Sequence, residues 1–176
     1  MKRSYPWQLL KNKAIGSTLI ELLIVVTLIA ILATLAIPSW KFLKHQQIIE
    51  QLNQLQIICT TSQQKATSTQ EKQTLTFEPN AHNFFFNQHT EKLLPGVSFG
   101  FLPGLKGPPS HPKKPITQAI TFPDQTITFY PDGTISAGTI YLINQQKEQY
   151  ALTVPISKAT FARKYRYQNN QWICLK

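Results

Sequence analysis

Cysteine is scarce in this chain, since only Cys59 and Cys174 occur among its 176 residues. Two cysteines permit at most one intramolecular disulfide. They also lie too far apart in the sequence to form a Cys-x-x-Cys metal or redox motif. A bridge between them and two separately buried thiols are both consistent with the sequence, because free cysteine is often buried.

Groups that perform catalysis are equally sparse. Histidine occurs at four scattered positions, and no two have the close spacing of metal ligands on one helix: His45, His82, His89 and His111. Asp124 and Asp132 each follow a proline in a turn context, where a short side chain bonds its own backbone. No glycine-rich loop follows a strand and opens a helix, so phosphate-binding fingerprints are missing. We predict no catalytic residue, metal site or cofactor; a membrane-anchored enzyme is an alternative that no residue pattern supports.

Long apolar runs are rare too, with one exception. Residues 19–37 read LIELLIVVTLIAILATLAI, and Glu21 is the only charge among them. As a helix this run would span about 28 Å, close to the hydrocarbon thickness of a bilayer. A small domain needs no core helix of such uniform apolarity, so we predict a membrane-inserted helix. A cleaved secretory signal is the alternative, although only residues 34–36 offer a cleavage context and no clean Ala-x-Ala site follows.

Charge is distributed unevenly around this run. Four basic residues and no acidic residue precede it, whereas Lys41 and Lys44 follow it closely. This asymmetry favours a cytoplasmic amino terminus, with the bulk of the chain across the membrane. The net charge is +10, and without residues 1–16 there remain 14 basic residues against 8 acidic ones, or +6. Such a balance permits adhesion to nucleic acid or anionic surfaces but does not by itself indicate it.

Glu21 is the informative residue of the apolar run. A carboxylate costs roughly 2.5–3.5 kcal/mol at the centre of a bilayer and less near its edge. No Lys, Arg or His lies between Glu21 and Lys41. We therefore expect a partner from outside the helix, or protonation, to neutralise it. A cut just before Ser17 would create an α-amino group that a neighbouring subunit could supply as that partner.

The segment GSTLIE at residues 16–21, followed by the apolar run, resembles the class III signal of type IV pilins and type II secretion pseudopilins. The resemblance implies that a prepilin peptidase cuts after Gly16, removes the leader 1–16 and methylates Ser17. Glu21 is then fifth in the mature chain, and Pro38 is twenty-second, where the family often has a proline that kinks or loosens the helix. The chain departs from the family in having Ser17 where Phe is usual and in its longer leader. The implied partners are the peptidase, the inner membrane and other pilins or pseudopilins, through residues 17–38.

The remainder of the chain predicts an α+β fold. Ile48, Leu52, Leu55 and Cys59 follow helical spacing, which predicts an amphipathic stem helix over 39–62, with 60–72 as its polar exit. Beyond it, residues 63–176 predict an exported, β-rich domain. Strands are expected at 74–77, 83–86, 96–101, 118–122, 126–130, 134–143, 149–154, 160–167 and 171–175. No helical pattern interrupts the last of these, so we expect the long helix to pack on an antiparallel, meander-like sheet or sandwich. Residues 100–115, rich in Pro and Gly, predict an irregular exposed loop.

The carboxy-terminal third carries a second resemblance. Residues 127–134, 140–142 and 150–154, which read ITFYPDGT, IYL and YALTV, resemble the GspH/FimT branch of minor pilins over about 121–167. Ala162-Arg163 stands where many relatives have Gly-Arg. The resemblance implies a structural minor pseudopilin of a type II secretion system. The alternative is a minor type IV pilin that acts in pilus assembly initiation or DNA uptake.

One segment of the predicted last hairpin resembles a binding site. In residues 163–167, RKYRY, alternation places Arg163 and the two tyrosines on one face of a strand and Lys164 and Arg166 on the other. Basic and aromatic side chains together can contact nucleic acid, so Arg163, Lys164 and Arg166 are candidate DNA ligands. Some relatives that take up DNA use Arg-x-Arg, whereas this chain has Arg-x-x-Arg. The alternative, which we favour, is an edge strand guarded by charges.

The same hairpin bears on the cysteines. Cys174 lies in the last predicted strand, with Trp172 on the same face by alternation. If that face packs on the stem helix, Cys174 could bridge to Cys59 and close a loop of about 115 residues, which the chain-entropy model values at over 4 kcal/mol.

Overall fold

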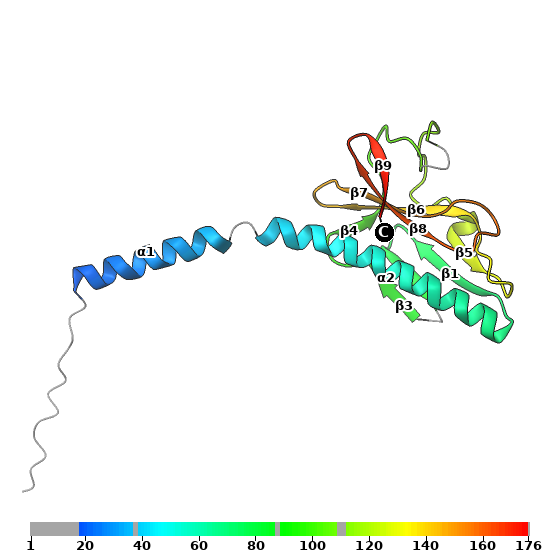
Figure 1. The fold of residues 1–176 in the computed structure, drawn as a ribbon, viewed down its shortest axis with the longest axis horizontal. Coiled ribbons are helices and arrows are strands. Elements are labelled where there is room, and N and C mark those ends of the chain that lie inside the picture. Colours follow the sequence, from blue (N-terminus) through cyan, green and yellow to red (C-terminus); the bar gives the residue numbers. More distant parts are fainter. Residues whose placement is uncertain (1–17, 37–38, 87–88, 109–111, 176) are drawn as a thin grey trace, which may run out of the picture. The chain divides into compact units, whose positions relative to one another are not determined.

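Figure 1 shows the computed structural model, which describes residues 18–36, 39–86, 89–108 and 112–175. The chain divides into two compact units, Met1–Trp40 and Lys41–Lys176. The first unit contains helix α1 (Leu19–Ala36). Helix α2 (Ser39–Thr69) begins at the boundary and runs into the second unit, which holds the nine strands found among the described residues.

The threonine hydroxyls at the start of helix α1 and within it bond the helix backbone. Thr18 lies just before the helix, and its hydroxyl is 3.4 Å from the Glu21 amide, the contact that an N-cap residue makes. The hydroxyls of Thr27 and Thr34 donate back to the carbonyls of Ile24 and Ile31 at 2.8 and 2.7 Å. Within the first unit every described side chain of α1 is exposed, and its large apolar side chains are 50–83% exposed. A helix that is apolar on all sides is stable only where something other than water surrounds it.

Helix α2 is held by one face. Ile48, Leu52, Leu55 and Cys59 are all buried, as their spacing predicts. The predicted end of the helix is wrong, because α2 continues to Thr69. The buried face is extended by Ser62 and Ala66, which have little or no apolar surface to mark them in the sequence. The side-chain amide of Gln63, on the same part of the helix, donates to the carbonyls of Gly133 and Thr160 at 2.6 and 2.9 Å. These tertiary contacts stabilise helical turns whose polar composition alone predicts the end of the helix.

The strands form two antiparallel sheets. The first has the order β3-β2-β1-β5 and contains β1 (Gln73–Glu78), β2 (Asn83–Phe86), β3 (His89–Lys92) and β5 (Thr126–Phe129). The second has the order β4-β6-β7-β8-β9 and contains β4 (Val97–Phe99), β6 (Gly138–Asn144), β7 (Gln149–Val154), β8 (Arg163–Gln168) and β9 (Gln171–Leu175). A short 3₁₀ turn, η1 (Pro123–Gln125), precedes β5. The predicted α+β class with antiparallel sheets is confirmed, although there are two sheets rather than one meander.

The strand predicted at 118–122 is wrong. This segment forms an isolated bridge between Ile120 and Ile140, in which the Thr121 amide donates to the Thr139 carbonyl and the Ala119 carbonyl accepts from the Tyr141 amide, but no strand. The Phe122 ring then lies against Gly138, where an added Cβ would come within 2.5 Å of the ring. This close approach takes the chain off the sheet edge, so the ladder does not extend.

Both sheets and α2 share one hydrophobic core. The buried face of α2 packs in the same cluster as Leu75 and Phe77 of β1, Phe129 of β5 and Leu152 of β7. A smaller cluster of Tyr141, Ala151 and Tyr165 lies on the other face of the second sheet, with Phe101, Ile116 and Trp172 against it. Strand β7 is therefore buried at every position, since both of its faces are covered.

Two turns follow from their sequences. Gly133 has φ of 81°, and its amide bonds the Tyr130 carbonyl at 2.9 Å. The Asp132 carboxylate accepts from the hydroxyl and the amide of Thr134, which lowers the pKa of Asp132. Asn169 and Asn170, at φ of 52° and 60°, connect β8 to β9 in the left-handed conformation that Asn tolerates.

The loop after β4 is irregular in its described part but not uniformly exposed. Leu105 is buried, and its carbonyl accepts from the Ile116 amide at 3.1 Å. The Gly107 amide bonds the Lys114 carbonyl at 2.7 Å, and the Trp172 indole donates to the Lys106 carbonyl at 3.0 Å. The predicted exposure is therefore wrong at Leu105, because these contacts fasten parts of the loop to the domain.

Candidate functional site

The amino-terminal candidates lie mostly outside the described residues. Gly16, Ser17 and Pro38 are among those that the structure does not describe. Glu21 lies in the first turn of α1, with its side chain exposed within the first unit. Within the described part of the chain, no helix combines enough length and apolarity to cross a membrane.

Strand β8 divides its basic side chains between two faces, as alternation predicts. Lys164 pairs with Leu152 in the sheet, and its ammonium donates to the Asn53 side chain of α2 at 2.9 Å. Arg166 lies on the same face, 3.1 Å from the Glu148 carboxylate and 5.8 Å from the centre of the Tyr150 ring. Both side chains are half-buried and bind the domain itself.

Arg163 is placed differently. It is exposed and lies opposite Thr153 on the other face of the sheet, with its guanidinium 4.8 Å from the centre of the Phe161 ring. Arg163, Lys164 and Arg166 therefore do not form one exposed basic row. The alternative of a charged edge strand is wrong, because β8 is paired on both sides and β9 is the edge.

Glu148 organises a polar cluster that the sequence analysis missed. Its carboxylate is 3.0 Å from Nδ1 of His45 on α2 and accepts from the Asn144 amide at 2.7 Å, in addition to Arg166. Burial raises the pKa of Glu148, but the hydrogen bonds from His45 and Asn144 and the charges of His45 and Arg166 outweigh burial and lower it. The sequence shows only one acid in a polar turn between two strands, which by itself does not indicate these partners.

The two cysteines are free thiols. Cys59 is buried in the α2 core, and burial raises its pKa to about 12. Cys174 is exposed and pairs with Tyr165, whose side chain belongs to the cluster on the opposite face of the sheet from α2. Alternation thus puts Cys174 and Trp172 on the face away from the helix, so the condition for the Cys59–Cys174 bridge is not met.

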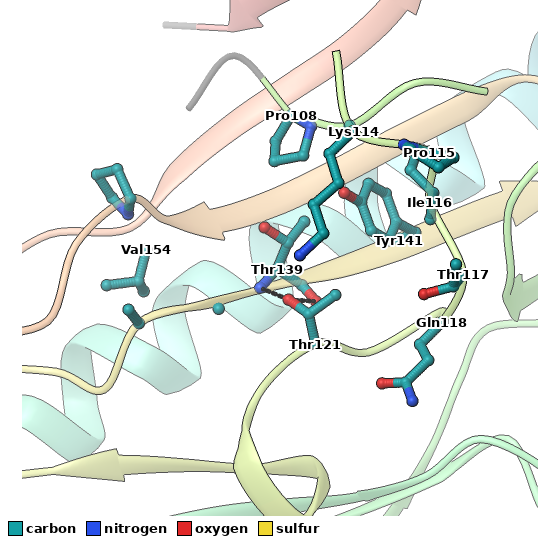
Figure 2. A pocket seen from close by; sticks show the side chains of 14 residues that line it. Pro108, Lys114, Pro115, Ile116, Thr117, Gln118, Thr121, Thr139, Tyr141 and Val154 are labelled. Carbon is teal, nitrogen blue, oxygen red and sulfur yellow. Dashed lines mark hydrogen bonds between the residues drawn. The ribbon is translucent and has the colours of Figure 1, made fainter. Parts of the chain in front are cut away.

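An open cleft of about 410 Å³ lies between the loop after β4 and the start of β6, and Figure 2 shows its lining. The Thr121 hydroxyl accepts from the Thr139 amide at 2.8 Å, so it serves the backbone. Lys114 and Tyr141 also line the cleft, and burial raises the pKa of Tyr141 to about 12. Within the described ranges no group of His, Cys, Asp or Glu side chains could hold a metal ion. We find no nucleophile held by a base among the described residues that line the cleft.

The Glu148 cluster generates a prediction about stability. A Glu148→Gln variant of residues 41–176 should lose about 1 kcal/mol of unfolding free energy at pH 7, because the charged hydrogen bonds with Arg166 and His45 become neutral or are lost. The folded-state pKa lies below the ordinary 4.5, so the stabilisation is fully present above that value and is lost as the pH falls through the folded pKa. Urea unfolding at pH 7 and pH 3 measures the difference.

The matched control is Glu91→Gln on β3, where the side chain is exposed. This change should alter the stability at pH 7 by a few tenths of a kcal/mol at most. If Glu148→Gln is as stable as the wild type at pH 7, the cluster contributes nothing to the attachment of α2.

Comparisons with known proteins agree with the amino-terminal pattern. Residues 11–37 match the family model described as the prokaryotic N-terminal methylation motif. No curated protein and no solved structure matches the chain. The motif implies processing by a prepilin peptidase, anchoring at the inner membrane and assembly with other pilin-like subunits. The matched residues are thus similar to the amino-terminal signal that type IV pilins and pseudopilins share.

Proposed function

We propose that this protein is a minor pseudopilin of a type II secretion system, related to the GspH/FimT branch. The match to the methylation motif over residues 11–37 is the observation that carries the proposal. It is supported by the second unit, in which an amphipathic helix shares one core with two antiparallel sheets. The resemblance to the branch covers β5, β6 and β7 and the turn at Gly133 between them.

Helix α1 has the surface that assembly requires. All of its described side chains are exposed within the first unit, and these side chains are apolar except for Thr and Glu21. Such a surface needs lipid before assembly and the α1 helices of neighbouring subunits afterwards. Both surroundings are apolar, so one surface serves the membrane-anchored and the assembled states.

Within this proposal, Glu21 recognises the neighbouring subunit. Cleavage after Gly16 would place a methylated α-amino group on Ser17, and methylation leaves that amine able to carry a charge. An ion pair between this group and Glu21 of the next subunit is worth more in an apolar interior than in water. The pair would also fix the axial register between α1 helices, since only one stagger brings the two charges together.

A minor type IV pilin is the second candidate, because the matched motif is common to both systems. For DNA uptake the candidate ligands are unfavourably placed, since Lys164 and Arg166 bind Asn53 and Glu148 of the same chain. Secretion therefore remains our first proposal.

The first test of the proposal is processing. The protein isolated from the membranes of its own cells should begin at Ser17 and carry one added methyl group on its α-amine, as measured by intact-mass and peptide mass spectrometry. A bulky replacement such as Gly16→Leu should leave the leader attached, whereas Lys13→Gln should be processed normally. An intact Met1, or a first residue near 37, would contradict the proposal.

The second test concerns Glu21. A Glu21→Gln variant should still be processed and remain in the membrane fraction, because the helix only becomes more apolar. Its recovery in the assembled fibre fraction should fall at least tenfold, since the α-amine of the neighbour loses its counter-charge. Glu50→Gln on α2 is the matched control and should assemble normally.

The same strains separate the two systems. Loss of secreted proteins from the medium with surface pili unchanged would favour the pseudopilin. Loss of pili with normal secretion would favour the minor pilin. If Glu21→Gln assembles as well as the wild type, the proposed ion pair is wrong for this subunit.

A further inference from the structure

The edges of the two sheets are protected unequally. In the first sheet, β3 presents exposed His89, Glu91 and Lys92, and Phe129 at the end of β5 is bridged to Ile135. In the second sheet, β4 is only three residues long. At the other end of that sheet, β9 has five residues, QWICL, and none carries a charge. Charges and short length are what normally prevent an edge strand from pairing, and β9 has neither.

The β8–β9 hairpin determines which backbone groups of β9 face outward. Its two-residue turn has positive φ at Asn169 and Asn170, the geometry of a type I′ turn. Such a turn closes on a hydrogen-bonded pair, here Gln168 and Gln171. Because bonded and non-bonded pairs alternate along an antiparallel ladder, Trp172 and Cys174 direct their N–H and C=O groups away from β8.

The side chains around this edge are suited to a partner strand. Ile173 is 45% exposed and presents apolar surface on the face shared with α2. On the other face, a hollow of about 640 Å³ is lined by the Tyr167 and Trp172 rings and by Lys106. The two rings lie 5.2 Å apart in an edge-to-face arrangement. An added strand would gain backbone hydrogen bonds along β9 and a pocket for one of its side chains, the combination by which sheet edges bind peptides.

Charge identifies the kind of partner. Arg163 is exposed on the neighbouring strand, and Lys106 lines the hollow. Lys164 bonds the neutral Asn53, whereas the charge of Arg166 is balanced by Glu148 and does not count toward this surface. A second copy of the chain paired through β9 would bring two basic hairpins together, which is unfavourable. An extended segment with acidic flanks and apolar residues at alternate positions would be attracted instead.

We propose that β9 is a strand-addition site that binds an extended, acid-flanked segment of a different polypeptide through the outward backbone groups of Trp172 and Cys174. The site belongs to the second unit and does not use α1. It would therefore let the subunit bind a partner while the amino-terminal helix is engaged elsewhere, and its test is independent of the proposed assembly.

The experiment uses the full-length chain in detergent micelles and the peptide acetyl-EEVTVTVEE-amide as the probe. Hydrogen exchange measured by mass spectrometry should slow at least tenfold at the Trp172 and Cys174 amides when the peptide is added. The peptide acetyl-EEVTPTVEE-amide has the same charge but a proline that interrupts the strand, so it should protect neither amide. Acetyl-KKVTVTVKK-amide should bind at least tenfold more weakly than the acidic probe.

Two substitutions at one position supply the matched pair. Cys174→Pro removes an outward N–H and leaves the ladder with β8 intact, because proline is tolerated where an edge strand faces solvent. Cys174→Ser removes the thiol and keeps the N–H. The proline variant should bind the acidic peptide at least tenfold more weakly than the wild type, and the serine variant should bind it equally well. The exchange measurement on the wild type decides the matter even if the proline variant does not fold.

Three results would overturn the proposal. The first is unchanged exchange at both amides with the acidic peptide present. The second is equally slow exchange at these amides with the proline-interrupted peptide, which would mean that the charge of the peptide and not strand pairing causes the protection. The third is a dimer of the chain that Cys174→Pro abolishes and Cys174→Ser retains, because a second copy would then be the occupant of β9.

Discussion

The second unit depends on a single packing constraint, which is that one face of α2 must close the core of two separate sheets. Ile48, Leu52, Leu55 and Cys59 are buried in the cluster that also contains residues of β1, β5, β6 and β7. Polar side chains at the margins of this face then fix the connections around it. Gln51 accepts from the Leu94 amide at 2.7 Å, Asn53 from Lys164 at 2.9 Å, and Gln63 donates to two loop carbonyls. The helix thus holds the two sheets in place through apolar packing, and it holds the loops and strand β8 through hydrogen bonds.

The two units expose surfaces of opposite character. Helix α1 presents apolar side chains in every direction within its own unit, with one carboxylate in its first turn. The second unit buries its apolar residues and leaves β9 as an uncharged, exposed edge beside basic side chains. In our account, α1 supplies the contacts common to all subunits of a fibre. The surface of the second unit, and the β9 edge in particular, supplies the contacts that distinguish this subunit from the others.

Strong periodicity made parts of the structure predictable. The stripe on α2, the strands β2, β7 and β9, and the turns at Gly133 and at Asn169-Asn170 all lie where spacing and turn chemistry place them. The same alternation correctly separated Arg163 from Lys164 and Arg166. Local patterns suffice in these cases, because alternation, helical spacing and turn residues mark each element within its own segment.

The errors arose where distant contacts decide the outcome. Helix α2 extends to Thr69 because Ala66 is buried and Gln63 is bonded to loops far along the chain. The segment 118–122 leaves the sheet where Phe122 meets Gly138, an approach that no local pattern encodes. Strand β3 has only exposed polar side chains and therefore no hydrophobic signal. Likewise the partners of Glu148 come from α2 and β8, so only the folded chain brings them together.

Our central proposal is that the second unit lies across the inner membrane from the cytoplasm, and the two cysteines provide a direct test of it. Cys174 is exposed and Cys59 is buried, so a thiol reagent should modify the folded chain only at Cys174. Intact cells with a permeabilised outer envelope are treated with a mild reductant and then with a membrane-impermeant maleimide. The account predicts modification of Cys174 without lysis of the inner membrane, with Cys59 modified only after denaturation. Modification of Cys174 that requires lysis of the inner membrane would contradict it.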